Sequence, residues 1–226
     1  MKTLKKDVCI FDLDGTLIDS VPDLALSINR MLADLERPSF EENTIRFWVG
    51  NGARMLVKRA LQGGEGVGDP IDQDLVESAL EIFLRHYERN LSTRTVPYPT
   101  VIETLDRLQA SGRRMGIITN KPVRFLNPIL SSLCWDDKFE LVLGGDSLDR
   151  QKPDPLPLRY FCEQLDVMIE RCVMIGDSRN DIAAARAAGM DVIAVSYGYN
   201  YGESISIYKP DRIVDCFDQI LPILGE

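Results

Sequence analysis

The chain has 226 residues, of which 45% are hydrophobic and 27% are charged, so it can bury a full core and has the composition of a globular protein. The net charge of −9 argues against nucleic acid or an anionic membrane as the main partner, because both need a basic surface. The length favours one full-sized domain with a smaller insert.

The N-terminal residues, the apolar runs, the cysteines and the histidine further limit the class of protein that we expect. Residues 1–6 lack the apolar core of a signal peptide, and no apolar run is long enough to span a membrane, so we expect a soluble cytoplasmic protein. The five cysteines show no C-x-x-C spacing and are expected to be reduced packing residues. The single histidine, His86, falls on a predicted helix among charged residues, so we do not expect histidine-based catalysis or metal binding.

The first strand is predicted at residues 8–11, an unbroken apolar run typical of a strand buried on both faces. Asp12 and Asp14 follow it directly. Buried carboxylates are costly unless a cation, hydrogen bonds or solvent compensates them. Gly15 permits a tight bend, and Thr16 adds a hydroxyl facing whatever the carboxylates bind. Taken alone, Asp14-Gly15 is also compatible with an ordinary turn.

Helical spacing replaces the strand pattern after Ser20. Apolar residues recur every three or four positions from Leu24 to Leu35, and two further amphipathic helices are predicted at residues 54–61 and 74–90. A glycine-rich loop at residues 63–68 separates these two helices. We therefore predict an all-helical inserted domain at residues 18–93, within a core domain of residues 1–17 and 94–226.

From Val96 onward, helices alternate with short apolar runs. We expect helices at residues 100–110, 123–133, 156–165 and 181–188, strands at residues 115–118, 141–143, 172–175 and 192–195, and a last strand-helix pair at residues 213–224. Such alternation predicts a doubly wound parallel α/β sheet of the Rossmann-like type. In this architecture ligands bind at the carboxyl ends of the strands.

Polar residues follow three of these strands and should therefore meet at one edge of the sheet. Thr119 comes after the first, Lys152 lies beyond the second, and Asp177 and Asp181 follow the third. Each has a simpler interpretation when taken alone: a helix cap for Thr119 and the aspartates, and a solvated loop position for the lysine. Together with the stretch at residues 12–16, they make four motifs in order, each after a predicted strand, and this favours an active site.

In this order the motifs resemble those of the haloacid-dehalogenase-like phosphohydrolase superfamily. That family has Asp-x-Asp-Gly-Thr after its first strand, which residues 12–16 match without a gap, then a threonine, a lysine before proline, and Gly-Asp-x-x-x-Asp. The resemblance covers essentially the whole chain. It implies a Rossmann-like core with an inserted helical cap and Mg²⁺-dependent hydrolysis of a phosphate monoester.

The resemblance also implies catalytic roles. Asp12 would be the nucleophile that forms an aspartyl-phosphate, and Asp14 the general acid on the leaving oxygen. Lys152 would orient Asp12, while Thr119 and the backbone of Asn120 would donate hydrogen bonds to the phosphoryl oxygens.

Oxygen ligands alone suit Mg²⁺. The resemblance implies Asp12, the Asp14 carbonyl and Asp177 as ligands of this metal. Asp181 would be a further ligand or would hold the waters of the metal.

Several stretches resemble more closely the bacterial branch that acts on 2-phosphoglycolate, and these stretches are residues 47–53, 119–122, 144–146, 176–181 and 197–203. Relatives with the same framework act on sugar phosphates or pyrophosphate, or isomerise phosphosugars, so these alternatives stay open. The dehalogenases of the superfamily lack the second aspartate, so Asp14 argues against that branch. A signalling receiver phosphorylated on aspartate is a further alternative, which Asp14 and the long insert disfavour.

The cap is expected to recognise the part of the small substrate that lies away from phosphorus. Gly52 would allow backbone N–H groups to face an anion, and Arg54, with Lys58 on the same helix face, is the candidate for a charged contact to its carboxylate. Solvated surface cations are the simpler interpretation of both side chains. The sequence leaves both a monomer and a homodimer open.

Overall fold

A six-stranded parallel sheet forms the centre of the computed structural model, which describes residues 3–64 and 71–226. Each neighbouring pair of strands is parallel. In spatial order the strands are β5 (Leu141–Leu143), β4 (Arg114–Ile118), β1 (Val8–Phe11), β6 (Cys172–Gly176), β7 (Asp191–Val195) and β8 (Arg212–Val214). The predicted doubly wound sheet is therefore confirmed, and β1 lies at its topological switch point.

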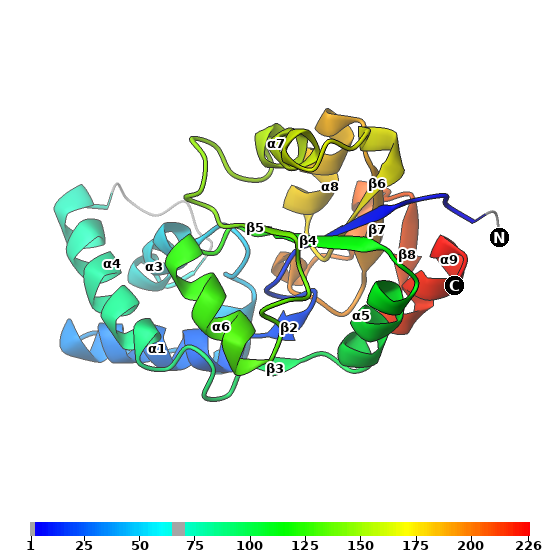
Figure 1. Cartoon of the computed structure of the whole chain (residues 1–226). Helices are drawn as coiled ribbons and strands as arrows, with labels where there is room; N and C mark the ends of the chain where they lie inside the picture. The colour runs from blue at the N-terminus through cyan, green and yellow to red at the C-terminus, as the bar shows by residue number, and fades with distance from the viewer. Residues whose placement is uncertain (1–2, 65–70) are drawn as a thin grey trace.

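Helices cover both faces of the sheet, as Figure 1 shows. The helices α7 (Leu156–Gln164) and α8 (Arg179–Ala188) pack on one face, and α5 (Val101–Ala110), α6 (Leu126–Ser132) and α9 (Ile220–Leu224) pack on the other. Strand β1 serves both layers because its side chains alternate, with Val8 and Ile10 in the α7/α8 cluster and Cys9 and Phe11 in the opposite one. This explains its continuous apolar run.

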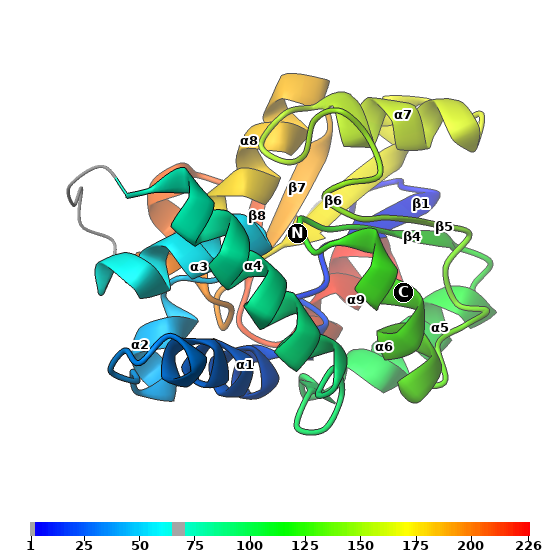
Figure 2. The same ribbon diagram turned by 90° about the vertical axis from the view of Figure 1, so that its left-hand side faces the viewer.

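A group of helices lies at one end of the sheet, away from both termini (Figure 1), and Figure 2 shows this end of the molecule facing the viewer. It comprises α1 (Val21–Asp34), α2 (Glu42–Arg46), α3 (Ala53–Gln62) and α4 (Gln73–Glu88). We propose that these helices form the cap domain, with the boundaries predicted above. Residues 65–68 of the expected glycine-rich loop lie outside the described residues.

The chain enters and leaves the cap at one place. Strand β2 (Ile18–Asp19) on the way in pairs antiparallel with β3 (Val96–Pro97) on the way out. The buried Asp23 carboxylate reinforces this junction by accepting the backbone N–H groups of Arg94 and Thr95, at 2.9 and 2.8 Å. The two connections are thus held side by side.

The predicted helices and strands lie within a few residues of the observed ones, and the differences have local causes. Helix α8 begins two residues early because the Asp181 carboxylate accepts the Ser178 N–H at 3.0 Å, one arm of a capping box. The helix expected at 123–133 starts as a 3-10 turn, where Pro128 has no N–H for the Arg124 carbonyl. The 3-10 segments are η1 (Val123–Phe125), η2 (Ile169–Arg171), η3 (Asn200–Gly202), η4 (Ile205–Tyr208) and η5 (Phe217–Gln219). Within the described ranges, no helix is both long and apolar enough to cross a bilayer.

Candidate active site

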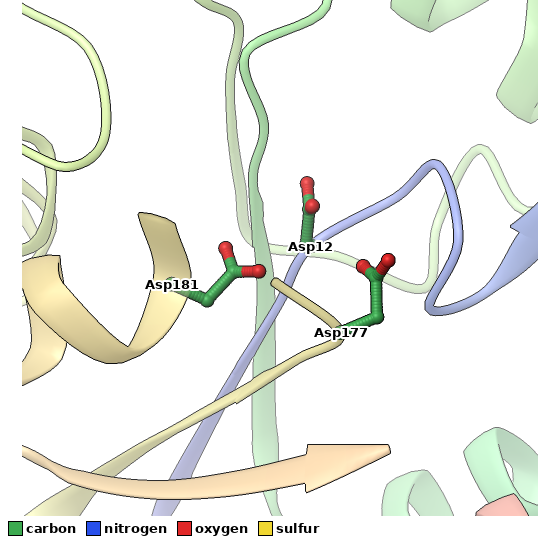
Figure 3. A group of neighbouring side chains, drawn as sticks. All are labelled: Asp12, Asp177 and Asp181. Atoms are coloured by element: carbon green, nitrogen blue, oxygen red, sulfur yellow. The ribbon is translucent and has the colours of Figure 1, made fainter. Parts of the chain in front are cut away.

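Three aspartates meet at the carboxyl ends of the central strands. Asp12 follows β1, Asp177 follows β6, and Asp181 belongs to the first turn of α8. One carboxylate oxygen of each lies within 4.8 Å of the others, and all three side chains are buried. Figure 3 shows Asp12 on the chain after β1, Asp177 at the end of β6 and Asp181 on α8, with their carboxyl groups on the same side of the strand ends. We call these residues the acidic cluster.

The acidic cluster carries more negative charge than its surroundings neutralise. Lys152, which is 2% exposed, places its ammonium 3.0 Å from Asp12 and 2.6 Å from Asp181. Even so, burial raises the pKa of Asp12 to about 6, although the charge of Lys152 opposes this rise. Burial and the charges of Asp12 and Asp181 raise the pKa of Asp177 well above its usual range. A buried set of oxygen donors with unbalanced charge could bind a hard metal cation.

The position of Asp177 is fixed from several sides. Its carboxylate accepts the Thr16 hydroxyl and the Tyr199 N–H, each at 2.8 Å. A Cβ at Gly15, where φ is 89°, or at Gly198 would collide with the Asp177 side chain. The structure thus brings the fully buried Thr16 to the acidic cluster, and its direct contact with substrate stays a prediction.

Asp12 and Asp14 face one cavity between the core and the cap. The volume of this cavity that the centres of water-sized molecules can occupy is about 40 Å³. Its other lining residues are Leu24, Val49, Gly50, Gly52, Ala53, Leu56, Phe83, Tyr87, Thr119, Asn120, Lys121, Pro122 and Phe125. The predicted residues Thr119, Asn120 and Gly52 are therefore brought together with the two aspartates. This arrangement lets the two carboxylates contact different atoms of one small ligand.

Two hydrogen-bonding partners hold the Asp14 carboxylate. The Ser20 hydroxyl donates to it at 2.6 Å, and the Lys121 ammonium lies 3.0 Å from both of its oxygens. Burial alone would lower the pKa of Lys121, but Asp14 raises it, so this side chain is a cation. The Asp14 carboxylate is not part of the acidic cluster, and metal ligation through the Asp14 carbonyl stays a prediction.

Two asparagine side chains tie the cap to the sheet edge. Both Asn120 and Asn180 donate from Nδ2 to the Gly50 carbonyl of the cap at 3.1 Å. Asn120 also donates to the Lys152 carbonyl at 2.9 Å. Its side chain therefore fastens the cap to the lysine loop, and the predicted contact to phosphate would come from its backbone.

Arg54 lies outside the cavity that Asp12 and Asp14 face. Its side chain is 50% exposed and pairs with Glu77 on α4. It lines a wider outer cavity of about 640 Å³, together with Lys58, and not the one that Asp12 and Asp14 line. The predicted contact between Arg54 and a substrate carboxylate stays a prediction.

Sequence reasoning did not single out Lys121, Tyr87 or Ser20 as site residues. Lys121 stands 4.7 Å from the centre of the Tyr87 ring, and burial raises the pKa of Tyr87 to about 12. Lys121 was recognisable as a neighbour of Thr119 at a strand end, whereas Tyr87 had the pattern of a core residue on an amphipathic helix. Their proximity depends on how the cap packs on the core.

Together, the fold and the site define a capped, doubly wound α/β enzyme with an aspartate-based centre at the carboxyl ends of its central strands. Residues 9–195 match the model of the haloacid dehalogenase-like hydrolase family. The chain belongs to this family, as its motifs predicted.

Individual relatives match almost the full length of the chain. A phosphoglycolate phosphatase of Colwellia psychrerythraea is 51% identical, over 98% of both chains. A phosphoglycolate phosphatase of Psychrobacter arcticus is 46% identical, over 98% of this chain and 96% of its own. The crystal structure of a predicted phosphoglycolate phosphatase from Haemophilus somnus superposes with a TM-score of 0.91 at 40% identity, over 97% of this chain and 98% of its own.

Proposed function

We propose that the chain hydrolyses 2-phosphoglycolate to glycolate and phosphate in a Mg²⁺-dependent reaction with an aspartyl-phosphate intermediate. The observation that carries this proposal is the pairing of buried Asp12 with Lys152 inside the acidic cluster, with Asp14 facing the same cavity as Asp12. A carboxylate paired with a lysine is held in position to attack phosphorus, and a separate carboxyl group is available to give a proton to the leaving oxygen.

The proposed roles follow from these positions. Asp12 attacks phosphorus as the bond from phosphorus to the leaving oxygen breaks, and Asp14, which enters this step protonated, gives its proton to that oxygen. The Asp14 carboxylate formed in this way then takes a proton from the water that cleaves the aspartyl-phosphate. Thr119 and the backbone N–H of Asn120 donate to the phosphoryl oxygens, while Lys152 holds Asp12 in place. These assignments divide attack and proton transfer between two aspartates.

Charge balance supports Mg²⁺ as the cation of this site. The acidic cluster supplies three carboxylates against the ammonium group of Lys152, which leaves a formal charge of −2. When bound, Mg²⁺ would supply two positive charges and polarise the phosphoryl group. Asp12, Asp177 and Asp181 would hold it, because their oxygens already lie close together.

The cavity favours 2-phosphoglycolate over a sugar phosphate. Beyond the aspartates its wall is largely apolar, with Leu24, Val49, Leu56, Phe83 and Phe125 among the lining residues. A sugar would bury several hydroxyls against these side chains at a cost of about 1 to 3 kcal/mol for each unpaired group. The names of the nearly full-length relatives support the same substrate.

A substrate comparison tests this proposal. Steady-state phosphate release should give the highest kcat/KM with 2-phosphoglycolate, compared with glucose 6-phosphate and pyrophosphate, in the presence of Mg²⁺. Higher values for either competitor would reassign the substrate. Isomerisation of a sugar phosphate without phosphate release would indicate a mutase, and a single phosphorylation without turnover would indicate a receiver.

Metal binding should be visible without catalysis. Saturating the chelator-treated protein with Mg²⁺ to a hundred times its Kd should raise Tm by about 5 to 10 °C, since the ion binds the folded state alone. The gain should shrink as the pH falls from 8 to 5.5, because burial raises the pKa of Asp12 to about 6 and that of Asp177 well above its usual range, so that protons compete with the metal. Scanning calorimetry at pH 8 and pH 5.5 measures both effects.

Matched variants locate the ion. Asp177→Asn should lose most of the Mg²⁺-dependent rise in Tm, while Asp137→Asn, which changes an exposed aspartate outside the acidic cluster, should keep it. An unchanged rise in Asp177→Asn would place the ion elsewhere.

A further inference from the structure

A second buried lysine stands in the wall of the active-site cavity. Lys121 is 5% exposed, and among the described residues that line this cavity it is the one with a positive charge. Burying an ammonium costs several kcal/mol unless it is paired. Lys152 already serves Asp12 and Asp181, whereas Lys121 contacts neither. The position of Lys121 therefore needs a separate explanation.

Pairing with Asp14 does not use all the hydrogen-bonding groups in this part of the cavity wall. The Lys121 ammonium has three N–H groups, and the Asp14 oxygens accept from it at 3.0 Å. Next to it, the Tyr87 hydroxyl is buried and makes no hydrogen bond of normal geometry within the described part of the chain. A buried hydroxyl that lacks a hydrogen bond of normal geometry leaves room for a polar ligand. Both side chains line the cavity that contains Asp12.

We propose that Lys121, assisted by the Tyr87 hydroxyl, binds the carboxylate of the substrate. This inference rests on the proposed function, because it assumes an anionic group close to the leaving oxygen. In 2-phosphoglycolate the carboxylate carbon is two bonds from that oxygen, and the leaving oxygen must touch Asp14 if Asp14 protonates it. The Lys121 ammonium, 3.0 Å from Asp14, is thus within reach of the carboxylate.

The structure also distinguishes Lys121 from Arg54, the other candidate for binding the carboxylate. Arg54 is half exposed, pairs with Glu77 and lines the outer cavity. A carboxylate bound there would not lie in the cavity wall formed by Asp12 and Asp14. The specificity for a carboxylate therefore resides in Lys121 of the core loop after β4 and in Tyr87 of α4, not in the α3 helix.

A comparison of two substrates tests this assignment. Ethyl phosphate has the same number of carbons as 2-phosphoglycolate and lacks the carboxylate. Lys121→Met should lower kcat/KM for both compounds, because Lys121 also contacts Asp14. In addition, the ratio of kcat/KM for 2-phosphoglycolate to kcat/KM for ethyl phosphate should fall tenfold to hundredfold, roughly the effect of one charged hydrogen bond. Arg54→Ala should leave the ratio unchanged. Lys121→Gln, whose amide can still donate to Asp14, provides the measurement if the methionine variant does not fold.

Binding gives a second readout. In an Asp12→Asn background, calorimetric titration should show that Lys121→Gln weakens binding of 2-phosphoglycolate more than that of ethyl phosphate. An unchanged ratio and unchanged relative binding in folded Lys121 variants would overturn the assignment, as would a fall in the ratio for Arg54→Ala. A wild-type protein that does not prefer 2-phosphoglycolate to ethyl phosphate would instead overturn the proposed function itself.

Discussion

Asp12→Asn should reduce turnover of 2-phosphoglycolate by at least about a thousandfold, the scale of loss seen when a catalytic nucleophile is removed. The amide has the same shape as the carboxylate but cannot attack phosphorus. Asp12 is held by Lys152 at 3.0 Å and accepts the Leu13 N–H at 2.8 Å, and an amide oxygen can keep the second contact. Steady-state phosphate release measures the loss.

The fold should survive this change. Asparagine removes one of three mutually repelling buried charges, which offsets part of the lost attraction to Lys152. Circular dichroism and Tm without metal should therefore stay close to the wild-type values. Residual activity above a few per cent in the folded variant would rule out Asp12 as the nucleophile, and mass spectrometry of acid-quenched wild-type protein should reveal the aspartyl-phosphate.

The second large effect concerns Asp14 and depends on the leaving group. Asp14→Asn should slow phosphoryl transfer from 2-phosphoglycolate by about a hundredfold to ten-thousandfold, the usual range for general acid catalysis. Transfer from p-nitrophenyl phosphate should change far less, because p-nitrophenolate leaves without a proton. The phosphorylation step must be measured directly, by rapid quenching, before dephosphorylation limits turnover.

Ser20→Ala is the matched control, because it changes how Asp14 is held without removing the Asp14 carboxyl group. It removes the 2.6 Å hydrogen bond to Asp14 and keeps the acid, so it should lower both rates by a similar, small factor. Equal losses for both leaving groups in Asp14→Asn would remove Asp14 from the acid role and leave it as a partner of Lys121.

Sequence-based prediction worked best for residues placed by the backbone. Asp12, Thr119 and Asp177 each follow a buried strand, and strands of a parallel sheet bring their carboxyl ends to one edge whatever the side chains do. The strand at residues 141–143 is also predictable from the sequence, because it is an apolar run bounded by polar residues.

What the sequence did not predict depends on contacts between distant segments. The Lys121–Asp14 pair joins residues 107 positions apart, and a lysine is usually exposed, so its burial could not be inferred locally. The direction of Arg54 required knowing how α3 lies against the core. The short helix α2 and the two-residue strands β2 and β3 contain too few residues for a period to be recognisable.

The junction between β2 and β3 has an evolutionary consequence. Because the two strands pair, the whole helical segment is, for the core, the loop of a hairpin whose ends are already closed. Loop-closure entropy grows only logarithmically, by about 0.6 kcal/mol for each doubling of length. A lineage could therefore lengthen, shorten or exchange this loop at little cost to core stability. Under the roles proposed here, selection could then reshape access to the cavity while the aspartates stay in place.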